Sequence, residues 1–238
     1  MKKLIQLASV AAVASAVLMS ANAAPVNLAS LLNGGSITIG DKTFSDFGFA
    51  SAQFQAADAT VEATVDVGGV YHLTFAGPFL SVGVTPSDVS LRYSVATTTG
   101  LPLIFAIDQA FELTSSGTGG MVLIGETVRR DSFVGTMVAQ SSLAHVAGHP
   151  DLDDFEDPVA EPLTGDQLSI SPAMNKVYVT KDVFMMGLPG GTVGPTKLIQ
   201  SFHQLPTNVP EAGSTLALMV LALGGLTVVA RGRASNRV

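Results

Sequence analysis

Apolar and polar residues alternate strictly in one early segment of the chain. Every odd position of residues 60–67 is apolar, and every even position is polar. Because successive side chains of a strand point to opposite faces of its sheet, this pattern predicts a strand with one buried face. Gly68 and Gly69 follow, and the alternation resumes over residues 70–75. Two glycines between two such runs predict a tight hairpin, because glycine adopts positive φ at little steric cost.

Similar short patterns recur from residue 28 to residue 204, broken by Gly, Pro, Asp and Ser, with no long stretch of helical period. Besides the hairpin, strands are expected at 36–39, 80–84, 89–95, 103–113, 121–128, 133–139, 176–184 and 197–203. About ten strands at this spacing predict an all-β fold, a β-sandwich-like domain.

The chain begins with the three parts of a secretory signal peptide. Lys2 and Lys3 precede an apolar run over residues 7–19, and small residues follow at 20–24. Such a segment directs export and is removed by signal peptidase, so we expect cleavage after Ala23. The alternative is a buried N-terminal helix, which is disfavoured because the run has no polar face to turn to water.

An uninterrupted apolar run of 15 residues, 216–230, lies near the other end. A helix of this length covers about 22 Å of a hydrocarbon core about 30 Å thick, so spanning requires local thinning of the bilayer. Arg231 and Arg233 follow the run and predict a cytoplasmic C-terminus. The preceding domain would then lie across the membrane, in agreement with the export signal.

The segment between these ends is strongly acidic. The chain has 12 Lys and Arg residues and 19 Asp and Glu residues, for a net charge of −7, and five of the basic residues belong to the ends. Along the sequence, no Lys/Arg cluster with interleaved aromatic residues appears. We therefore expect no nucleic-acid partner, because phosphate backbones would be repelled. The chain has no Cys, which excludes disulfides and Cys-ligated zinc.

A short motif precedes the C-terminal apolar run. It consists of Val209, Pro210, Glu211, Gly213, Ser214 and Thr215. Together with the apolar helix and the terminal arginines, it resembles the tripartite sorting signals of the PEP-CTERM class, especially the VPDSG-type variant (VPDSG-CTERM). The resemblance implies that an exosortase, an integral membrane enzyme, recognises Pro210 and Glu211 and processes the protein.

Glu211 replaces the Asp of the variant. Ala212 replaces the Pro of the commoner form, which leaves the exosortase subtype open. An ordinary tail anchor is the alternative, since it needs the same helix and charges. Residues 31–47, 179–183 and 200–204 also resemble the bodies of other proteins with such signals. Those bodies have no established general activity, so this resemblance implies an exported β-sandwich and no particular chemistry.

We therefore expect five segments: a signal peptide (1–23), an extracytoplasmic β-sandwich (24–205), a linker with the sorting motif (206–215), a transmembrane helix (216–230) and a basic cytoplasmic tail (231–238). The protein would be anchored in the inner membrane facing the periplasm, and would reach the cell surface or extracellular matrix after processing. We expect a non-enzymatic structural or adhesive domain. The alternative is an extracytoplasmic hydrolase or a carbohydrate-binding module on the same fold, and extracellular polysaccharide is a candidate partner.

One acidic segment could hold a metal ion. Its acidic residues are Asp151, Asp153, Asp154, Glu156, Asp157 and Glu161. Carboxylates at this density are ligands that Ca²⁺ prefers, but no Gly stands at the sixth position of an EF-hand loop. Pro158 and Pro162 also stiffen the run. A solvated acidic loop is therefore favoured over a calcium site, and no cofactor is expected.

His145 and His149 have the spacing of zinc ligands on a helix. Their segment lacks the Glu that would act as general base, and Gly148 and Pro150 oppose a helix, so a zinc site is disfavoured. His72 is expected to be an ordinary strand residue.

We expect no catalytic residues. No Gly-x-Ser-x-Gly elbow appears, and no Ser is marked out by a neighbouring His and acid. His203 is expected to be an ordinary residue near the linker. The glycine-rich residues 187–194 lack a Gly-Lys-Ser/Thr ending and predict a loop rather than a phosphate-binding site. Paired catalytic carboxylates stay open as an alternative, because their separation is a tertiary property.

Overall fold

The computed structural model describes residues 21–98, 102–147 and 168–205. The signal run up to residue 20, the acidic segment, the sorting motif and the C-terminal apolar run with its arginines lie outside these residues. Within the described ranges, no helix has the length and apolar character needed to cross a membrane.

The described residues are almost entirely β. The strands are β1 (Ala21–Asn22), β2 (Val26–Asn27), β3 (Ile37–Ile39), β4 (Lys42–Ala50), β5 (Thr60–Val65), β6 (Tyr71–Ala76), β7 (Ser81–Val82), β8 (Ser87–Thr97), β9 (Ile104–Ser116), β10 (Gly120–Arg129), β11 (Met137–Val146), β12 (Leu168–Met174), β13 (Lys176–Gly187) and β14 (Thr192–Gln204). A four-residue helix, α1 (Leu28–Leu31), and a 3-10 turn, η1 (Ala56–Asp58), are the helical elements of these ranges.

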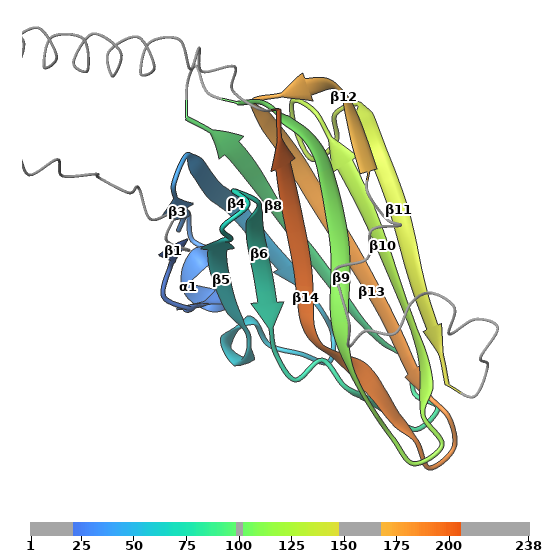
Figure 1. Cartoon of the computed structure of the whole chain (residues 1–238). Coiled ribbons are helices and arrows are strands. Elements are labelled where there is room, and N and C mark those ends of the chain that lie inside the picture. The colour runs from blue at the N-terminus through green and yellow to red at the C-terminus, as the bar shows by residue number, and fades with distance from the viewer. Residues whose placement is uncertain (1–20, 99–101, 148–167, 206–238) are drawn as a thin grey trace, which may run out of the picture. The chain divides into compact units, whose positions relative to one another are not determined.

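The strands form two antiparallel sheets in a sandwich-like arrangement, which confirms the all-β prediction (Figure 1). The eight-stranded sheet, called sheet A, has the order β1-β5-β6-β14-β9-β12, with β2 paired to β5 and β7 paired to β14. The six-stranded sheet, called sheet B, has the order β11-β10-β13-β8-β4-β3.

Strands β5 and β6 form the predicted hairpin, with Val65 opposite Tyr71. Gly69 adopts a φ of 80° in the turn. The Asp66 carboxylate accepts a hydrogen bond of 2.9 Å from the backbone amide of Val70 and closes the turn. The hairpin is therefore confirmed, although Gly69 and not Gly68 has the positive φ, and the alternation places Leu73 in the core.

The inward faces of the two sheets pack on an apolar core with an aromatic centre. Its rings are those of Phe44, Phe47, Phe75, Tyr93 and Phe202, all of them buried. Tyr93 lies at the middle of this group, with ring centroids 5.5 Å from Phe75 and 6.3 Å from Phe202. Burial of such large apolar surfaces is the main favourable contribution to folding in a chain without disulfides.

Buried polar residues join the two sheets beside this centre. Lys181 of β13 donates a hydrogen bond of 2.7 Å to the Oε1 atom of Gln109 in β9. Gln200 of β14 donates one of 3.2 Å to Oε1 of Glu126 in β10. Since buried polar groups need partners, these contacts fix how the two sheets lie against each other.

Two parts of the strand prediction are wrong or incomplete. The strand expected at 133–139 begins at Met137 and runs to Val146, because residues 130–136 form a loop. Strands β1, β2, β4 and β12 were not predicted. The pairing of β4 with β8 shifts register between Ser45 and Gly48, so the inward positions of β4 do not keep a period of two.

Candidate binding site

The loop between β10 and β11 is held by its own hydrogen bonds. The amide of Arg130 donates to the carbonyl of Thr136 at 3.0 Å, and the amide of Gly135 donates to the carbonyl of Ser132 at 3.0 Å. The Arg129 guanidinium also donates to the Gly135 carbonyl at 2.9 Å. Asp131 adopts a φ of 68°, which Asp tolerates better than most residues. This network gives the loop one shape, so its side chains project from fixed positions.

Two aromatic side chains lie between two cationic ones over the outer face of sheet B next to this loop. Lys176 Nζ lies 4.8 Å from the centre of the Tyr178 ring. The rings of Tyr178 and Phe133 meet edge to face with centroids 5.1 Å apart. The Arg92 guanidinium lies 5.2 Å from the centre of the Phe133 ring. Such contacts are attractive because the face of an aromatic ring is electronegative.

Arg129 and Arg130 complete this surface from β10 and the loop. Arg129 pairs directly with Tyr178 across the two strands. We call the set the basic–aromatic surface; it comprises Arg92, Arg129, Arg130, Phe133, Lys176 and Tyr178. The side chains come from β8, β10, β13 and the β10–β11 loop, so the fold assembles a cluster that is absent along the sequence.

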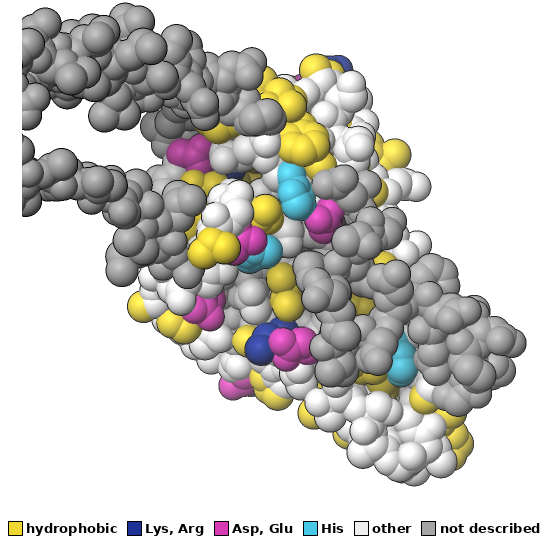
Figure 2. Space-filling model, viewed as in Figure 1, with side chains coloured by type: hydrophobic (Ala, Val, Ile, Leu, Met, Phe, Trp, Pro, Cys, Tyr) yellow, Lys and Arg dark blue, Asp and Glu magenta, His cyan; other side chains and the backbone are white. Residues whose placement is uncertain are grey.

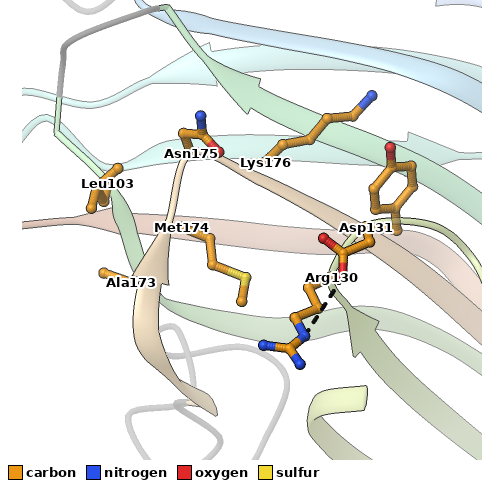
Figure 3. Close-up of a pocket in the computed structure, with 8 residues that line it drawn as sticks. Leu103, Arg130, Asp131, Ala173, Met174, Asn175 and Lys176 are labelled. Atoms are coloured by element: carbon orange, nitrogen blue, oxygen red, sulfur yellow. Dashed lines mark ion pairs between the residues drawn. The ribbon is translucent and has the colours of Figure 1, made fainter. Parts of the chain in front are cut away.

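A pocket of about 460 Å³ opens at one end of this surface (Figure 3). It is lined by Leu103, Arg130, Asp131, Ala173, Met174, Asn175, Lys176 and Tyr178. In Figure 3, Arg130 extends from the loop and Met174 from β12 into the space between these two elements. A second pocket, of about 390 Å³, is lined in part by Arg92 and Phe49. The basic–aromatic surface therefore connects two hollows, the larger of which we call the end pocket.

Local hydrogen bonds hold the charges at the end pocket in place. Asp46 accepts hydrogen bonds from the Ser94 hydroxyl at 2.7 Å and from Lys176 at 3.1 Å, and these lower its pKa. Burial works against the charge of Lys176, but its hydrogen bonds with Asp46 and Tyr178 outweigh burial and raise its pKa. Both groups are therefore ionised at neutral pH. Arg130 and Asp131 form an exposed ion pair at 3.6 Å, marked in Figure 3.

The outer face of sheet A carries a different polar group. Figure 2 shows histidine side chains beside acidic ones on the face in view. His72 Nδ1 lies 3.0 Å from Ser201 Oγ, and its Nε2 atom lies 3.5 Å from Asp66. His203 Nε2 lies 2.6 Å from Asp108. The sequence marked out no Ser with a neighbouring His and acid, but the fold brings Ser201, His72 and Asp66 together.

This group lacks the other parts of a nucleophilic site. Ser201 is 6% exposed and lies within β14, which is flanked by β6 and β9. The backbone amides around it belong to these sheet ladders, so they offer no oxyanion hole. Among the described residues, no three His, Asp or Glu side chains are placed to hold a metal ion. The group is best described as polar pairing on a sheet surface.

The remaining predicted site residues divide between strands, loops and undescribed positions. His72 lies on β6 as expected, and His145 lies on β11, a strand rather than a helix. His149 and the candidate calcium ligands lie outside the described residues, as does every residue of the sorting motif. Residues 188–191 form the turn between β13 and β14, in agreement with the predicted loop.

Comparisons with known proteins give a weak likeness to a solved structure. No protein-family model matches the sequence, and no curated protein matches it. Among solved structures, TmCBM61 in complex with beta-1,4-galactotriose is similar at 12% sequence identity and a TM-score of 0.30. The similarity covers 67% of this chain and 90% of that one. A likeness this low says nothing about ligands, so the residues of this chain must carry any functional conclusion.

Proposed function

We propose that this protein is an exported, non-enzymatic adhesive protein whose β-sandwich binds polysaccharide along the basic–aromatic surface. The observation that carries the proposal is the row of Tyr178, Phe133 and Arg92 between two hollows. Sugar rings present apolar C–H faces that pack on aromatic rings, and their hydroxyls hydrogen-bond to charged and amide groups. An elongated surface with a hollow at each end suits a chain of sugar units better than a single small molecule.

The end pocket supplies suitable hydrogen-bonding groups. Asn175 and Asp131 are exposed at its rim, and Arg130 adds further donors. Its volume of about 460 Å³ falls within the range of about 300–1,000 Å³ that is usual for ligand sites. Since the Lys176–Asp46 ion pair and the loop hydrogen bonds fix these groups in advance, little ordering is needed on binding.

The carboxyl groups argue against the rival function, a glycosidase-like hydrolase. A general acid in such an enzyme needs a raised pKa. The pKa of each of the described residues Asp41, Asp46 and Asp66 is instead lowered. Burial raises the pKa of Asp41 and Asp66, but hydrogen bonds from neighbouring donors outweigh it.

Export and sorting form the second part of the proposal. The signal-like N-terminus, the Val-Pro-Glu-x-Gly-Ser-Thr motif and the apolar run followed by arginines support export and exosortase processing. Intact mass of the protein from its host and from a strain lacking the exosortase tests this part. A host form that ends near Pro210 and Glu211, with the tail kept in the mutant strain, supports processing. A tail kept in both strains would mean a plain membrane anchor.

Polysaccharide binding is tested with the full-length protein against a panel of neutral and acidic polysaccharides, by retardation in affinity gels. Tyr178→Ala should abolish or greatly weaken retardation. Phe184→Ala is the matched control, because Phe184 lies on the same face of β13, about 20 Å along the strand. If no polysaccharide retards the wild type, or if both variants bind equally well, the proposed function is wrong.

A further inference from the structure

Positive charge that lacks an acidic partner gathers on the basic–aromatic surface. In the described part of the chain, Lys42 and Lys181 are buried and paired with Asp41 and Glu126. Outside this surface, the only other cation of these ranges is Lys197, which lies 2.8 Å from Glu112. The other described basic residues are Arg92, Arg129, Arg130 and Lys176, all of which belong to the surface.

Two of these four cations have no carboxylate partner among the described residues. No ion pair within the described ranges involves Arg92 or Arg129. Among the residues that the structure describes, Arg130 pairs with Asp131, whose side chain is 81% exposed, and solvent screens such a pair strongly. Arg92 itself is exposed and lies over the Phe133 ring, with its planar group open to a ligand. Guanidinium groups in such positions bind carboxylates in a bidentate manner.

We infer that the polysaccharide is anionic and carries carboxylate groups, as in a polymer of uronic acids. This inference rests on the proposed function and specifies its ligand. Aromatic rings would contact the sugar faces, while Arg92 and Arg130 would contact carboxylates of the bound chain. The protein as a whole has a net charge of −7 and repels polyanions, so an acidic chain is held only where the local charge is positive.

The test compares two polymers that share one backbone. Polygalacturonate carries a carboxylate on each unit, and its methyl-esterified form does not. The full-length protein should bind polygalacturonate at least tenfold more tightly than the esterified polymer at low salt, and the difference should shrink as salt rises. The double variant Arg92→Gln/Arg130→Gln should lose this preference. Lys197→Gln removes one positive charge from the other sheet and should keep it.

Each other outcome overturns a distinct claim. Equal binding of both polymers, abolished by Tyr178→Ala, would refute the anionic ligand and leave polysaccharide binding intact. Loss of the preference in Lys197→Gln as well would show that net charge alone decides it, which also refutes the inference. Binding of duplex DNA as tight as that of polygalacturonate would refute the assignment to a polysaccharide. Failure to bind any polysaccharide of the panel would refute the proposed function itself.

Discussion

The ammonium group of Lys181 lies 2.5 Å from the Oε2 atom of Glu126 between the two sheets, and the two residues are 1% and 2% exposed. They are direct neighbours on β13 and β10. Gln109 and Gln200 reach the pair from the opposite sheet. The Glu126 charge also acts on the aromatic core. Burial and this charge raise the pKa of Tyr93 well above its ordinary value.

This ion pair provides the first prediction. Lys181→Met leaves the Glu126 carboxylate buried without its cation, so the free energy of unfolding should fall by about 3–5 kcal/mol. The double variant Lys181→Met/Glu126→Leu removes both charges and should recover most of that loss. Urea unfolding of both variants checks this. Equal losses in the single and double variants would contradict it, since they would mean that the pair itself supplies the stability.

The second prediction concerns the β10–β11 loop, which shapes the end pocket. A Cβ atom added at Gly135 would lie 2.0 Å from the Arg130 carbonyl oxygen. Gly135→Ala should therefore displace the loop and weaken polysaccharide binding at least tenfold, with a smaller effect on the melting temperature. Gly125→Ala is the control, because its Cβ would meet only the Asp182 carbonyl at 3.9 Å. Unchanged binding in Gly135→Ala would show that the loop does not form the site.

The third prediction concerns pH. The hydrogen bond with Asp108 outweighs burial and raises the pKa of His203 above its ordinary value of 6.5. The stability that this pair contributes is therefore fully present below that ordinary value and is lost as pH rises through the raised pKa. The loss of stability in His203→Gln should be larger at about pH 5.5 than at about pH 8.5. Asp108→Asn should remove the same pH dependence, and a pH-independent loss in both variants would contradict the assignment.

The fourth prediction concerns the N-terminus. Residues Ala21 and Asn22 pair with β5, and the amide of Ala23 donates to the Ala63 carbonyl at 2.9 Å. Cleavage after Ala23 would remove this short strand and leave β2 on the same edge, where Val26 pairs with Val61. A protein that starts at Ala24 should therefore melt within about 5 °C of the uncleaved form, since about 1 kcal/mol is at stake. A larger drop would contradict the expectation that residues 21–23 contribute little beside β2.

Much of the fold could be predicted because the local patterns are strong. The β5–β6 hairpin follows from strict alternation around two glycines, and β8 follows from apolar residues at alternate positions. Strand β4 escaped because Lys42 is buried and the register shift puts both Phe44 and Phe47 inside. A charged inward residue and a bulge each break the pattern that indicates a strand.

The candidate site could not be predicted, because the fold alone brings its parts together. Arg92, Phe133 and Tyr178 lie more than forty residues apart in sequence and meet through the pairing of β8, β13 and β10. Phe133 was also assigned to a strand, whereas it lies in the loop whose shape depends on Gly135. The sequence indicated an acidic protein without a basic cluster. Basic residues do not cluster along the chain, but the fold brings four of them together on one surface.

The location of the ligand is the central claim, and amide hydrogen exchange tests it most directly. The full-length protein is compared alone and with saturating polygalacturonate, or with the best binder of the polysaccharide panel. We predict slower exchange in the β10–β11 loop, residues 130–136, and at residues 173–178 around the end pocket. Slower exchange confined to residues 196–203, on β14 of the other sheet, would contradict the proposed site.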